Sequence, residues 1–460
     1  MNAADFSSLG LRPELLENLR SLDYTRMTAI QAQSLPSVLD GQDVIARAKT
    51  GSGKTAAFGL GLLQRLDVER FRIQSLVLCP TRELADQVAR ELRRLARGIH
   101  NIKILTLCGG APFGPQRDSL RHGAHILVGT PGRIEEHLRK GSLQLDHVTA
   151  LVLDEADRML DMGFQPSVDA IVAQLRKERQ TLLFSATYPD QIERLAGRIM
   201  RRPKTVEVET THDERSIRQA FYRIEKNKLR LNTLRLLLLK FRPESTLVFC
   251  NTKRETDEVA DELRSRGFAA LALHGDLEQR ARDQVLVRFA NRSVSVLVAT
   301  DVAARGLDIE QMDAVINYHI ARDPEVHVHR VGRTGRAGHK GLALTVFSAD
   351  EDYRAERLGD YLGQNIEVEE LPPWSLLEKP AFRPPMATLQ IDGGRKQKVR
   401  PGDILGALTS ENGVAGKQVG KINVFDYCAY VAVERAAAKP ALRKLRDGKI
   451  KGRSFRLRRI

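Results

Sequence analysis

The chain of 460 residues has little cysteine, few aromatic side chains and no long apolar run. Its four cysteines show no paired spacing, which excludes a disulfide scaffold and gives no support to a zinc site. No run of about 18 apolar residues occurs, so we expect no membrane span. The first residues lack the basic start and apolar core of a signal peptide. We therefore expect a cytoplasmic protein with reduced thiols and no membrane partner.

Positive charge is concentrated at one end of the chain. The formal net charge is +15, and residues 386–460 hold 17 Lys and Arg against 6 Asp and Glu, a net of +11. This excess predicts a polyanionic partner for that segment, and nucleic acid is favoured over a membrane because no amphipathic apolar face accompanies the charge. A merely solvated basic surface is the alternative that charge alone leaves open.

Apolar runs and helix-like segments alternate in two blocks of the sequence. Runs such as "SLVLCP" and "ALVLDE" recur up to Val208, and the same rhythm resumes after the polar stretch "ETTHDERSIR". This alternation predicts two parallel sheets covered by helices. The prolines of "LPPWSLLEKPAFRPP" then favour a semi-rigid spacer. We expect an α/β domain over 1–208, a linker over 209–218, a second α/β domain over 219–368, a Pro-rich linker over 369–385 and a small basic domain over 386–460.

The segment "AKTGSGKT" follows an apolar run and precedes a helix-like one. Its glycines would let backbone N–H groups surround a phosphate at a helix N-terminus. Lys54 would then reach the β- and γ-phosphates, and Thr55 would ligate Mg²⁺. Alanine replaces the first glycine of the usual pattern, so a Gly-rich turn without a ligand stays open on this segment alone. The predicted phosphate loop consists of Ala48, Lys49, Thr50, Gly51, Ser52, Gly53, Lys54 and Thr55.

An acidic pair ends another apolar run, "ALVLD". Asp154 and Glu155 would lie at the edge where a parallel sheet presents its ligands. In a metal–nucleotide site, Asp154 would hold Mg²⁺ and Glu155 would orient and polarise the attacking water. The alternative is a pair of acidic residues at a helix N-terminus. The phosphate loop upstream favours the metal–nucleotide site.

Residues 154–157 spell DEAD, and the chain resembles the DEAD-box RNA helicases, which have two RecA-like domains in tandem. The resemblance implies an ATP-dependent RNA helicase that uses ATP and Mg²⁺. "LDYTRMTAIQ" resembles the motif that reads adenine, which implies a base contact from Gln31, stacking by Tyr24 and an upstream aromatic, Phe6. "SAT", Ser185 to Thr187, resembles the motif that couples hydrolysis to strand separation.

Further motifs follow in family order through both blocks. "HRVGRTGRAG" resembles the motif whose arginines cross from the second domain to the γ-phosphate, which implies that role for Arg333 and Arg336. Asp308 matches the family's ribose contact. "PTRELA", "GG", "TPGR", "HGDLEQRAR" and "ATDVAARGLD" resemble the RNA-backbone motifs. The RNA contacts implied by these motifs are Thr81, Arg82, Gly110, Thr130, Arg133, Gln279, Arg282 and Thr300.

The basic segment 386–460 shows the order β-α-β-β-α-β, an α+β plan similar to RNA-recognition (RRM-like) modules. It lacks the usual outer aromatics, so base stacking on its sheet is poorly supported. "GGRKQKVRPGDILGALT" closely resembles the C-terminal domain of the bacterial DbpA subfamily. The RNA contacts expected in this segment are Arg395, Lys396, Lys398 and Arg400.

The subfamily resemblance implies a role in assembly of the large (50S) ribosomal subunit, with this domain on a hairpin of 23S rRNA. Two other functions stay open. One is an ATP-gated RNA clamp, and the other is a general RNA chaperone whose tail recruits a protein partner. The sequence does not indicate an oligomeric state.

Overall fold

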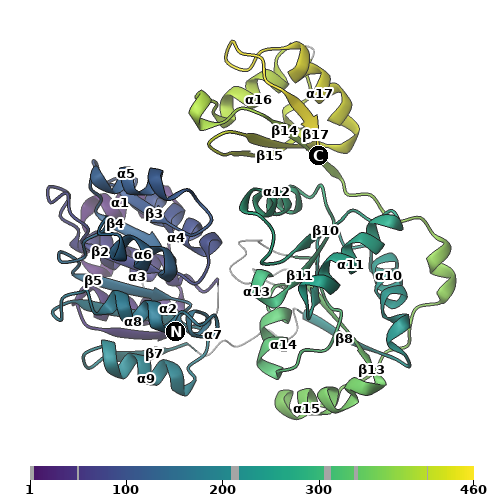
Figure 1. Cartoon of the computed structure of the whole chain (residues 1–460), viewed down its shortest axis with the longest axis horizontal. Helices are drawn as coiled ribbons and strands as arrows, with labels where there is room; N and C mark the ends of the chain where they lie inside the picture. Colours follow the sequence, from purple (N-terminus) through teal and green to yellow (C-terminus); the bar gives the residue numbers. More distant parts are fainter. Residues whose placement is uncertain (1–4, 49–50, 209–216, 305–311, 336–339, 412) are drawn as a thin grey trace. The chain divides into compact units, whose positions relative to one another are not determined.

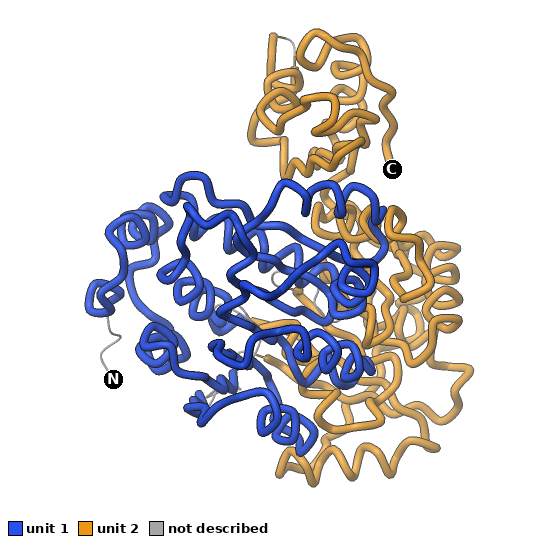
Figure 2. The backbone as a smooth tube through the Cα atoms, turned by 60° about the vertical axis from the view of Figure 1, so that its left-hand side comes forward, with its two compact units in different colours: residues 1–211, 306–308 blue, residues 212–305, 309–460 orange. Residues whose placement is uncertain are grey.

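The computed structural model describes residues 5–48, 51–208, 217–304, 312–335, 340–411 and 413–460. The chain forms two compact units, which Figure 2 distinguishes by colour. Unit 1 contains residues 1–211 and 306–308, and unit 2 contains residues 212–305 and 309–460. Among the described residues, no helix is both long enough and apolar enough to cross a bilayer.

Unit 1 is built on a seven-stranded sheet in which every neighbouring pair is parallel. The strand order is β3-β4-β2-β5-β6-β1-β7 (Figure 1). The strands are β1 (Val44–Arg47), β2 (Ser75–Leu78), β3 (Ile104–Leu107), β4 (Ile126–Gly129), β5 (Ala150–Asp154), β6 (Gln180–Ser185) and β7 (Lys204–Glu207).

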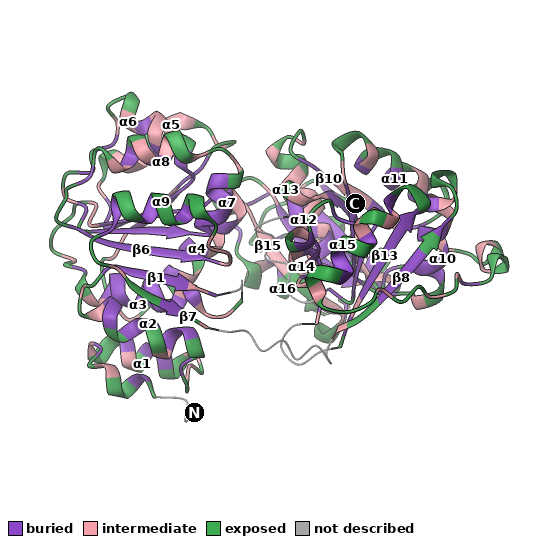
Figure 3. Cartoon of the chain, turned by 90° about the horizontal axis from the view of Figure 1, so that it is seen from below, coloured by how far each residue is buried: buried purple, intermediate pink, exposed green. Residues whose placement is uncertain are grey.

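Helices cover both faces of this sheet. Helices α1 to α4 pack with one set of strand side chains, such as Val152. Helices α6 to α9 pack with the alternate set, such as Leu151. Figure 3 shows the resulting buried strands between helices. Successive side chains of a strand point in opposite directions, and because helices cover both faces, both sets are buried. The helices are α1 (Pro13–Ser21), α2 (Ala29–Leu39), α3 (Lys54–Arg65), α4 (Arg82–Leu95), α5 (Phe113–Arg121), α6 (Pro131–Arg139), α7 (Ala156–Asp161), α8 (Gln165–Val172) and α9 (Asp190–Ile199).

Unit 2 begins with a second parallel sheet, of order β10-β11-β9-β12-β13-β8. Its strands are β8 (Ile217–Ile224), β9 (Thr246–Cys250), β10 (Ala270–Leu273), β11 (Val296–Thr300), β12 (Ala314–Asn317) and β13 (Gly341–Ser348). Its helices are α10 (Arg230–Phe241), α11 (Lys253–Ser265), α12 (Gln279–Ala290), α13 (Asp301–Ala304), α14 (Pro324–Val331) and α15 (Asp352–Leu362). Side chains of α10 and α11 fill the core on one face, and α15 packs with Phe221 and Phe347 on the other.

The Pro-rich segment is not a free spacer. It contains a 3₁₀ helix, Trp374–Glu378, and Leu371 and Leu377 pack against the core of the second sheet. Phe382 is buried there, with its ring edge-on to Phe268 at 5.9 Å. The prolines prevent a long helix, but the apolar side chains between them anchor the segment to its neighbour.

The C-terminal part of unit 2 is a four-stranded antiparallel sheet of order β15-β16-β14-β17. Its elements are β14 (Met386–Ile391), α16 (Pro401–Thr409), β15 (Val419–Val424), β16 (Ala429–Glu434), α17 (Ala438–Asp447) and β17 (Leu457–Arg459). Both helices pack on one face, over Leu389, Val431 and their neighbours. The predicted fold class, two parallel-sheet domains followed by a small α+β domain, is confirmed.

Candidate active site and nucleic-acid interface

The phosphate loop leads from β1 into the first turn of α3. Gly53 caps the helix with a φ of +94°, a conformation that L side chains rarely adopt. Lys54 is buried, and its Nζ donates to the Ala48 carbonyl at 2.9 Å. An ammonium has three N–H donors, so the same group can also bond phosphate oxygens. Lys49 and Thr50 lie outside the described residues.

Gln31 connects the predicted adenine-reading segment to this loop. Its Nε2 donates to the Gly53 carbonyl at 3.1 Å, and its Oε1 accepts the Thr28 N–H at 2.9 Å. A Cβ on Gly53 would lie 2.5 Å from Gln31 Nε2, so a larger residue there would displace the Gln31 amide. Tyr24 donates from its hydroxyl to Glu91 at 2.7 Å, and its ring lies edge-on to the buried Phe6 at 6.3 Å.

The acidic pair sits where β5 ends and α7 begins. Asp154 is buried, and burial raises its pKa to about 6, against the lowering effect of the Lys54 ammonium. Glu155 has a left-handed backbone, with a φ of +51°. Its Oε2 accepts from the Arg158 guanidinium at 2.8 Å, and both side chains are buried, so the direction of the carboxylate is fixed.

Asp157 joins this site to the SAT segment, a function that the sequence reasoning missed. Its Oδ2 accepts from the Thr187 hydroxyl at 2.8 Å, the Thr187 N–H at 2.9 Å and the Ala186 N–H at 3.2 Å. Ser185 Oγ accepts from the Asp157 N–H at 3.3 Å. Burial alone would raise the pKa of Asp157, but these bonds and nearby cations hold it below its ordinary value. Two motifs 30 residues apart thus act as one hydrogen-bonded unit.

The predicted RNA residues of unit 1 follow the ends of β2, β3 and β4. Thr81 begins α4, where its Oγ1 accepts the Leu84 N–H at 3.3 Å, and Arg82 lies 3.7 Å from Asp86. Thr130 Oγ1 accepts the Gly109 N–H at 3.4 Å, which ties the TPGR segment to the GG turn.

Arg133 strengthens that connection. Its guanidinium donates to the Ala111 carbonyl at 2.9 Å and contacts Glu136 at 3.0 Å. Gly110 is exposed in the turn, with a φ of +74°. These contacts join the TPGR segment to the GG turn, and the parallel pairing of β2 and β3 with β4 places all three RNA-motif segments at the same edge of the sheet.

In unit 2, the structure reveals a motif contact that was not predicted. Arg330 is buried and donates to both carboxylate oxygens of Asp301 at 2.7 and 2.8 Å. It also donates to the His319 carbonyl at 3.1 Å. The two bonds to Asp301 join the HRVGRTGR segment to the ATD segment. Thr300 of the ATD segment is the last residue of β11. Arg333 is buried two residues beyond α14, whereas Asp308 and Arg336 lie outside the described residues.

Gln279 and Arg282 lie in the first turn of α12. Gln279 donates to Asp283 at 2.7 Å, and Arg282 donates to the Ala303 carbonyl of α13 at 3.0 Å. The second contact joins the HGDLEQRAR segment to the ATD segment. The predicted RNA residues of unit 2 therefore belong to connected elements.

The chemistry of the site formed by the phosphate loop and the acidic pair fits ATP with Mg²⁺. The glycine cradle and the buried Lys54 suit phosphates. Magnesium takes one or two carboxylates and keeps waters and phosphate oxygens as its other ligands. The buried carboxylate of Asp154 suits that mode, together with the predicted ligand Thr55. Within the described ranges, no three His, Cys, Asp or Glu side chains gather as a ready-made metal cage.

The basic turn of the C-terminal domain, Gly393–Arg400, lies between β14 and α16. It contains a one-turn 3₁₀ helix, Arg395–Gln397, followed by Lys398 with a φ of +61°. All four predicted RNA side chains in it are exposed. The Arg400 N–H donates to Asp403 at 2.9 Å, which fixes the start of α16.

The sheet of this domain has one face turned away from α16 and α17, and α12 covers part of that face. Thr388 and Gln390 are fully buried there. The Gln284 amide donates to Gln390 Oε1 at 3.0 Å, and Asn291 donates to Thr388 Oγ1 at 3.2 Å. This face is therefore an internal contact surface of unit 2.

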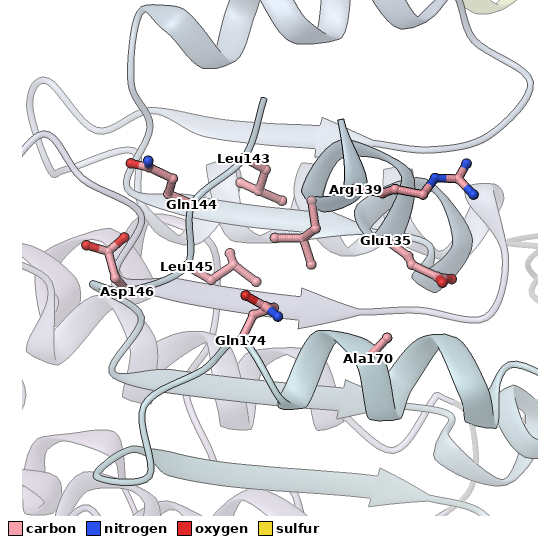
Figure 4. Close-up of a pocket in the computed structure, with 9 residues that line it drawn as sticks. Glu135, Arg139, Leu143, Gln144, Leu145, Asp146, Ala170 and Gln174 are labelled. Carbon is pink, nitrogen blue, oxygen red and sulfur yellow. The ribbon is translucent and has the colours of Figure 1, made fainter. Parts of the chain in front are cut away.

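A separate pocket of about 560 Å³ lies in unit 1, between α6, α8 and the segment that precedes β5 (Figure 4). Leu138, Leu143 and Leu145 form its apolar lining, with Glu135 and Arg139 at one end. None of the predicted site residues lines it.

Three family matches agree with this anatomy. Residues 28–195 match the DEAD/DEAH box helicase family, residues 227–338 match the helicase conserved C-terminal domain, and residues 388–459 match the DbpA RNA binding domain. Together with the two parallel sheets, they define a DEAD-box RNA helicase with an additional RNA-binding domain.

Curated relatives identify the family within the DEAD-box RNA helicases. The chain is 54% identical to the ATP-dependent RNA helicase DbpA of Escherichia coli, over 98% of this chain and 99% of the relative. It is 36% identical to the Bacillus subtilis protein of the same name, over 98% of each. The chain belongs to the DbpA family of ATP-dependent RNA helicases, and it is therefore an RNA-dependent ATPase.

Solved structures support the helicase fold. S. cerevisiae Dbp5 bound to RNA and ADP BeF3 is 31% identical, with a TM-score of 0.73, over 80% of this chain and 96% of that one. Mss116p bound to ssRNA and AMP-PNP is 26% identical, with a TM-score of 0.72, over 82% and 81%.

Proposed function

We propose that this helicase opens short RNA duplexes locally in the cytoplasm and that its C-terminal domain targets it to a 23S rRNA hairpin in the precursor of the 50S subunit. The observation that carries the proposal is the exposed basic turn in a domain that matches the DbpA RNA binding domain. The subfamily resemblance of that turn supports 23S rRNA as the target. Mg²⁺ would accompany ATP, held by Asp154 and Thr55.

The helicase motifs explain turnover but not the choice of RNA. In the proposed reaction, Lys54 binds the phosphates and Glu155, held by Arg158, orients the attacking water. Arg333 and Arg336 stabilise the charge that develops on the γ-phosphate when the two units close. The RNA motifs would contact the backbone, and such contacts position a protein without specifying a sequence. The target must therefore be selected elsewhere, and the C-terminal domain carries most of the excess charge.

The test is the ATPase rate of the full chain with 23S rRNA fragments and with an unrelated structured RNA of equal length. We expect strong stimulation by one 23S fragment and weak stimulation by the unrelated RNA. Removal of residues 386–460 should abolish that difference and leave a low RNA-stimulated rate. A full-length variant with Arg395→Ala and Lys396→Ala should lose the same difference. Because it keeps the covered sheet face intact, it separates the loss of the basic turn from the loss of the whole domain.

Equal stimulation of the full chain by both RNAs would contradict the targeting proposal. A strand-displacement assay on a tailed duplex separates helicase activity from clamping, because an ATP-gated clamp would hydrolyse ATP without releasing a strand. If specificity appeared only after a ribosomal protein was added, the tail would recruit a protein instead of RNA.

A further inference from the structure

The basic turn is attached through its backbone to the hairpin loop Phe425–Cys428, which joins β15 to β16. The Arg395 N–H donates to the Phe425 carbonyl at 2.8 Å, and the Lys396 N–H donates to the Asp426 carbonyl at 2.9 Å. A Cβ on Gly394 would lie 2.2 Å from the Phe425 oxygen, so the glycine permits this close approach. The two segments therefore form one rigid surface, which we call the turn pair.

Tyr427 lies in the hairpin loop of the turn pair. Its side chain is 68% exposed, the highest value among the large exposed apolar side chains of the described residues. The loop beneath it is well held, because the Phe425 N–H donates to the Cys428 carbonyl at 2.8 Å and the Phe425 ring lies edge-on to Tyr430 at 5.6 Å. A single exposed aromatic is ordinary on a protein surface, so it indicates a binding surface only when its neighbours do.

Those neighbours are cationic. The backbone bonds place the exposed Arg395 and Lys396 beside the hairpin loop, and Lys451 Nζ reaches the Lys398 carbonyl at 3.4 Å. One acidic side chain in the loop, Asp426, faces Arg395 at 3.8 Å. An aromatic face next to a net positive surface is the combination that binds single-stranded nucleic acid, with stacking for bases and cations for phosphates.

The other tyrosine of this domain is closed off. Tyr430 lies on the sheet face that α12 covers, and it is 2% exposed. Thr388 and Gln390 on the same face are bonded to side chains from α12 and from the segment that follows it. A base can therefore reach the ring of Tyr427 but not that of Tyr430.

We propose that Tyr427 stacks on an unpaired base of the RNA whose phosphates Arg395 and Lys396 hold. This inference rests on the proposed function, because it assumes that the C-terminal domain binds RNA. It assigns the target of that domain a chemical feature, an unpaired nucleotide next to the contacted phosphates.

The test measures binding by fluorescence anisotropy with the full chain, in the absence of nucleotide. The probe is the 23S rRNA fragment that best stimulates the ATPase, with a second set in which single loop nucleotides are abasic. Tyr427→Ala should weaken binding about 5- to 150-fold, the effect of losing one stacked base. Tyr427→Phe should bind like the wild type. Tyr361→Ala removes another exposed tyrosine of unit 2 and should have no effect.

Two further results complete the test. One abasic probe should bind wild type and Tyr427→Ala equally, which identifies the stacked base. Lys396→Ala should lower the salt dependence of binding by about one unit of slope, whereas Tyr427→Ala should not change it.

Wild-type affinity in Tyr427→Ala, or equal losses in Tyr427→Ala and Tyr427→Phe, would overturn the stacking role. If Tyr427→Ala has no effect while Arg395→Ala and Lys396→Ala weaken binding, only this inference fails. If all of these variants bind like the wild type, the proposed function of the turn pair fails with it.

Discussion

Asp157 shows how a single carboxylate connects two motifs of the nucleotide site. It accepts one hydroxyl and two N–H groups from residues 186–187 while its own N–H donates to Ser185. Hydrogen bonds to a charged acceptor contribute about 1.5–3 kcal/mol each. Movement of the acidic segment after hydrolysis must therefore move the SAT segment or break these bonds.

A valine at position 187 tests this connection. Thr187→Val keeps the side-chain shape and the backbone bond but removes the hydroxyl that donates to Asp157 at 2.8 Å. We expect near-normal RNA-stimulated ATPase and about tenfold less duplex separated per ATP hydrolysed, because a bond of this kind is worth a factor of ten or more. Parallel ATPase and strand-displacement assays measure the ratio.

Thr181→Val is the matched control, because Thr181 is buried on β6, the strand that leads to Thr187, and its hydroxyl contacts the Ile199 carbonyl at 3.4 Å. An unchanged ratio in Thr187→Val would show that the hydroxyl does not transmit hydrolysis to strand separation.

Residue spacing predicted some candidate side chains of the site and missed the contacts that others make. Lys54 and Asp154 were predicted because each follows an apolar strand, where a parallel sheet presents its ligands. Arg330 and Asp157 were missed because their partners lie about 30 residues away, and a motif does not show the direction in which a side chain points. The catalytic roles assigned from the motifs stay predictions.

At the scale of the element, strand order sorts the motifs of unit 1. The strands β3, β4 and β2 lie together and lead into the predicted RNA residues, while β5, β6 and β1 lead into the nucleotide residues. The centre of the sheet, where β2 pairs with β5, is the boundary between the two sets. The apolar runs predicted strands and parallel pairing, but the order depends on crossovers for which the sequence has no local signal.

The core of unit 2 contains an ion cluster that fixes α10 to the end of β13. Arg230 is 2% exposed and donates to Glu351 at 2.6 Å, to Asn227 at 2.8 Å and to the Val346 carbonyl at 2.9 Å. Burial alone would raise the pKa of Glu351, but His319 and Arg230 lower it to about 2.

Glu351→Gln should destabilise unit 2 by about 3–5 kcal/mol at neutral pH, because it leaves the buried Arg230 without its counter-charge. The pKa of Glu351 is lower in the folded state, so its contribution is complete above its unfolded value of about 4.3 and is lost as the pH falls towards 2. The difference in unfolding free energy between the wild type and Glu351→Gln should therefore shrink below about pH 4.

Calorimetry of the full chain between pH 3 and 7 measures this prediction. Glu356→Gln, an exposed site on α15, is the control and should leave unfolding unchanged. A difference that stays constant with pH would contradict the assigned charge pairing.

At the scale of the whole molecule, α12 combines predicted RNA contacts with an observed contact to the C-terminal sheet. Its first turn carries Gln279 and Arg282, which are predicted RNA contacts, and Gln284 together with the end of the helix holds the C-terminal sheet. The sequence predicted a separate basic domain after a spacer. It could not predict this attachment, because the polar residues Thr388 and Gln390 have no local pattern that distinguishes a covered face from a solvated one.

Thr388→Arg should release the C-terminal domain from α12. Thr388 is fully buried and shares hydrogen bonds with Ser293 at 2.7 Å and Asn291 at 3.2 Å, so an arginine cannot fit. Release would let the C-terminal domain move independently of α12. It would also remove the fixed spacing between two RNA-binding surfaces and so reduce the effective concentration of one for the other.

We therefore expect a higher concentration of 23S rRNA fragment for half-maximal ATPase, with unchanged RNA binding in the absence of nucleotide. Thr409→Arg adds the same charge at an exposed position on α16 and should behave like the wild type. If Thr388→Arg lowered RNA binding itself, the domain would have unfolded, and far-ultraviolet circular dichroism would show it. Unchanged activation would mean that the covered face does not couple the C-terminal domain to the helicase motifs.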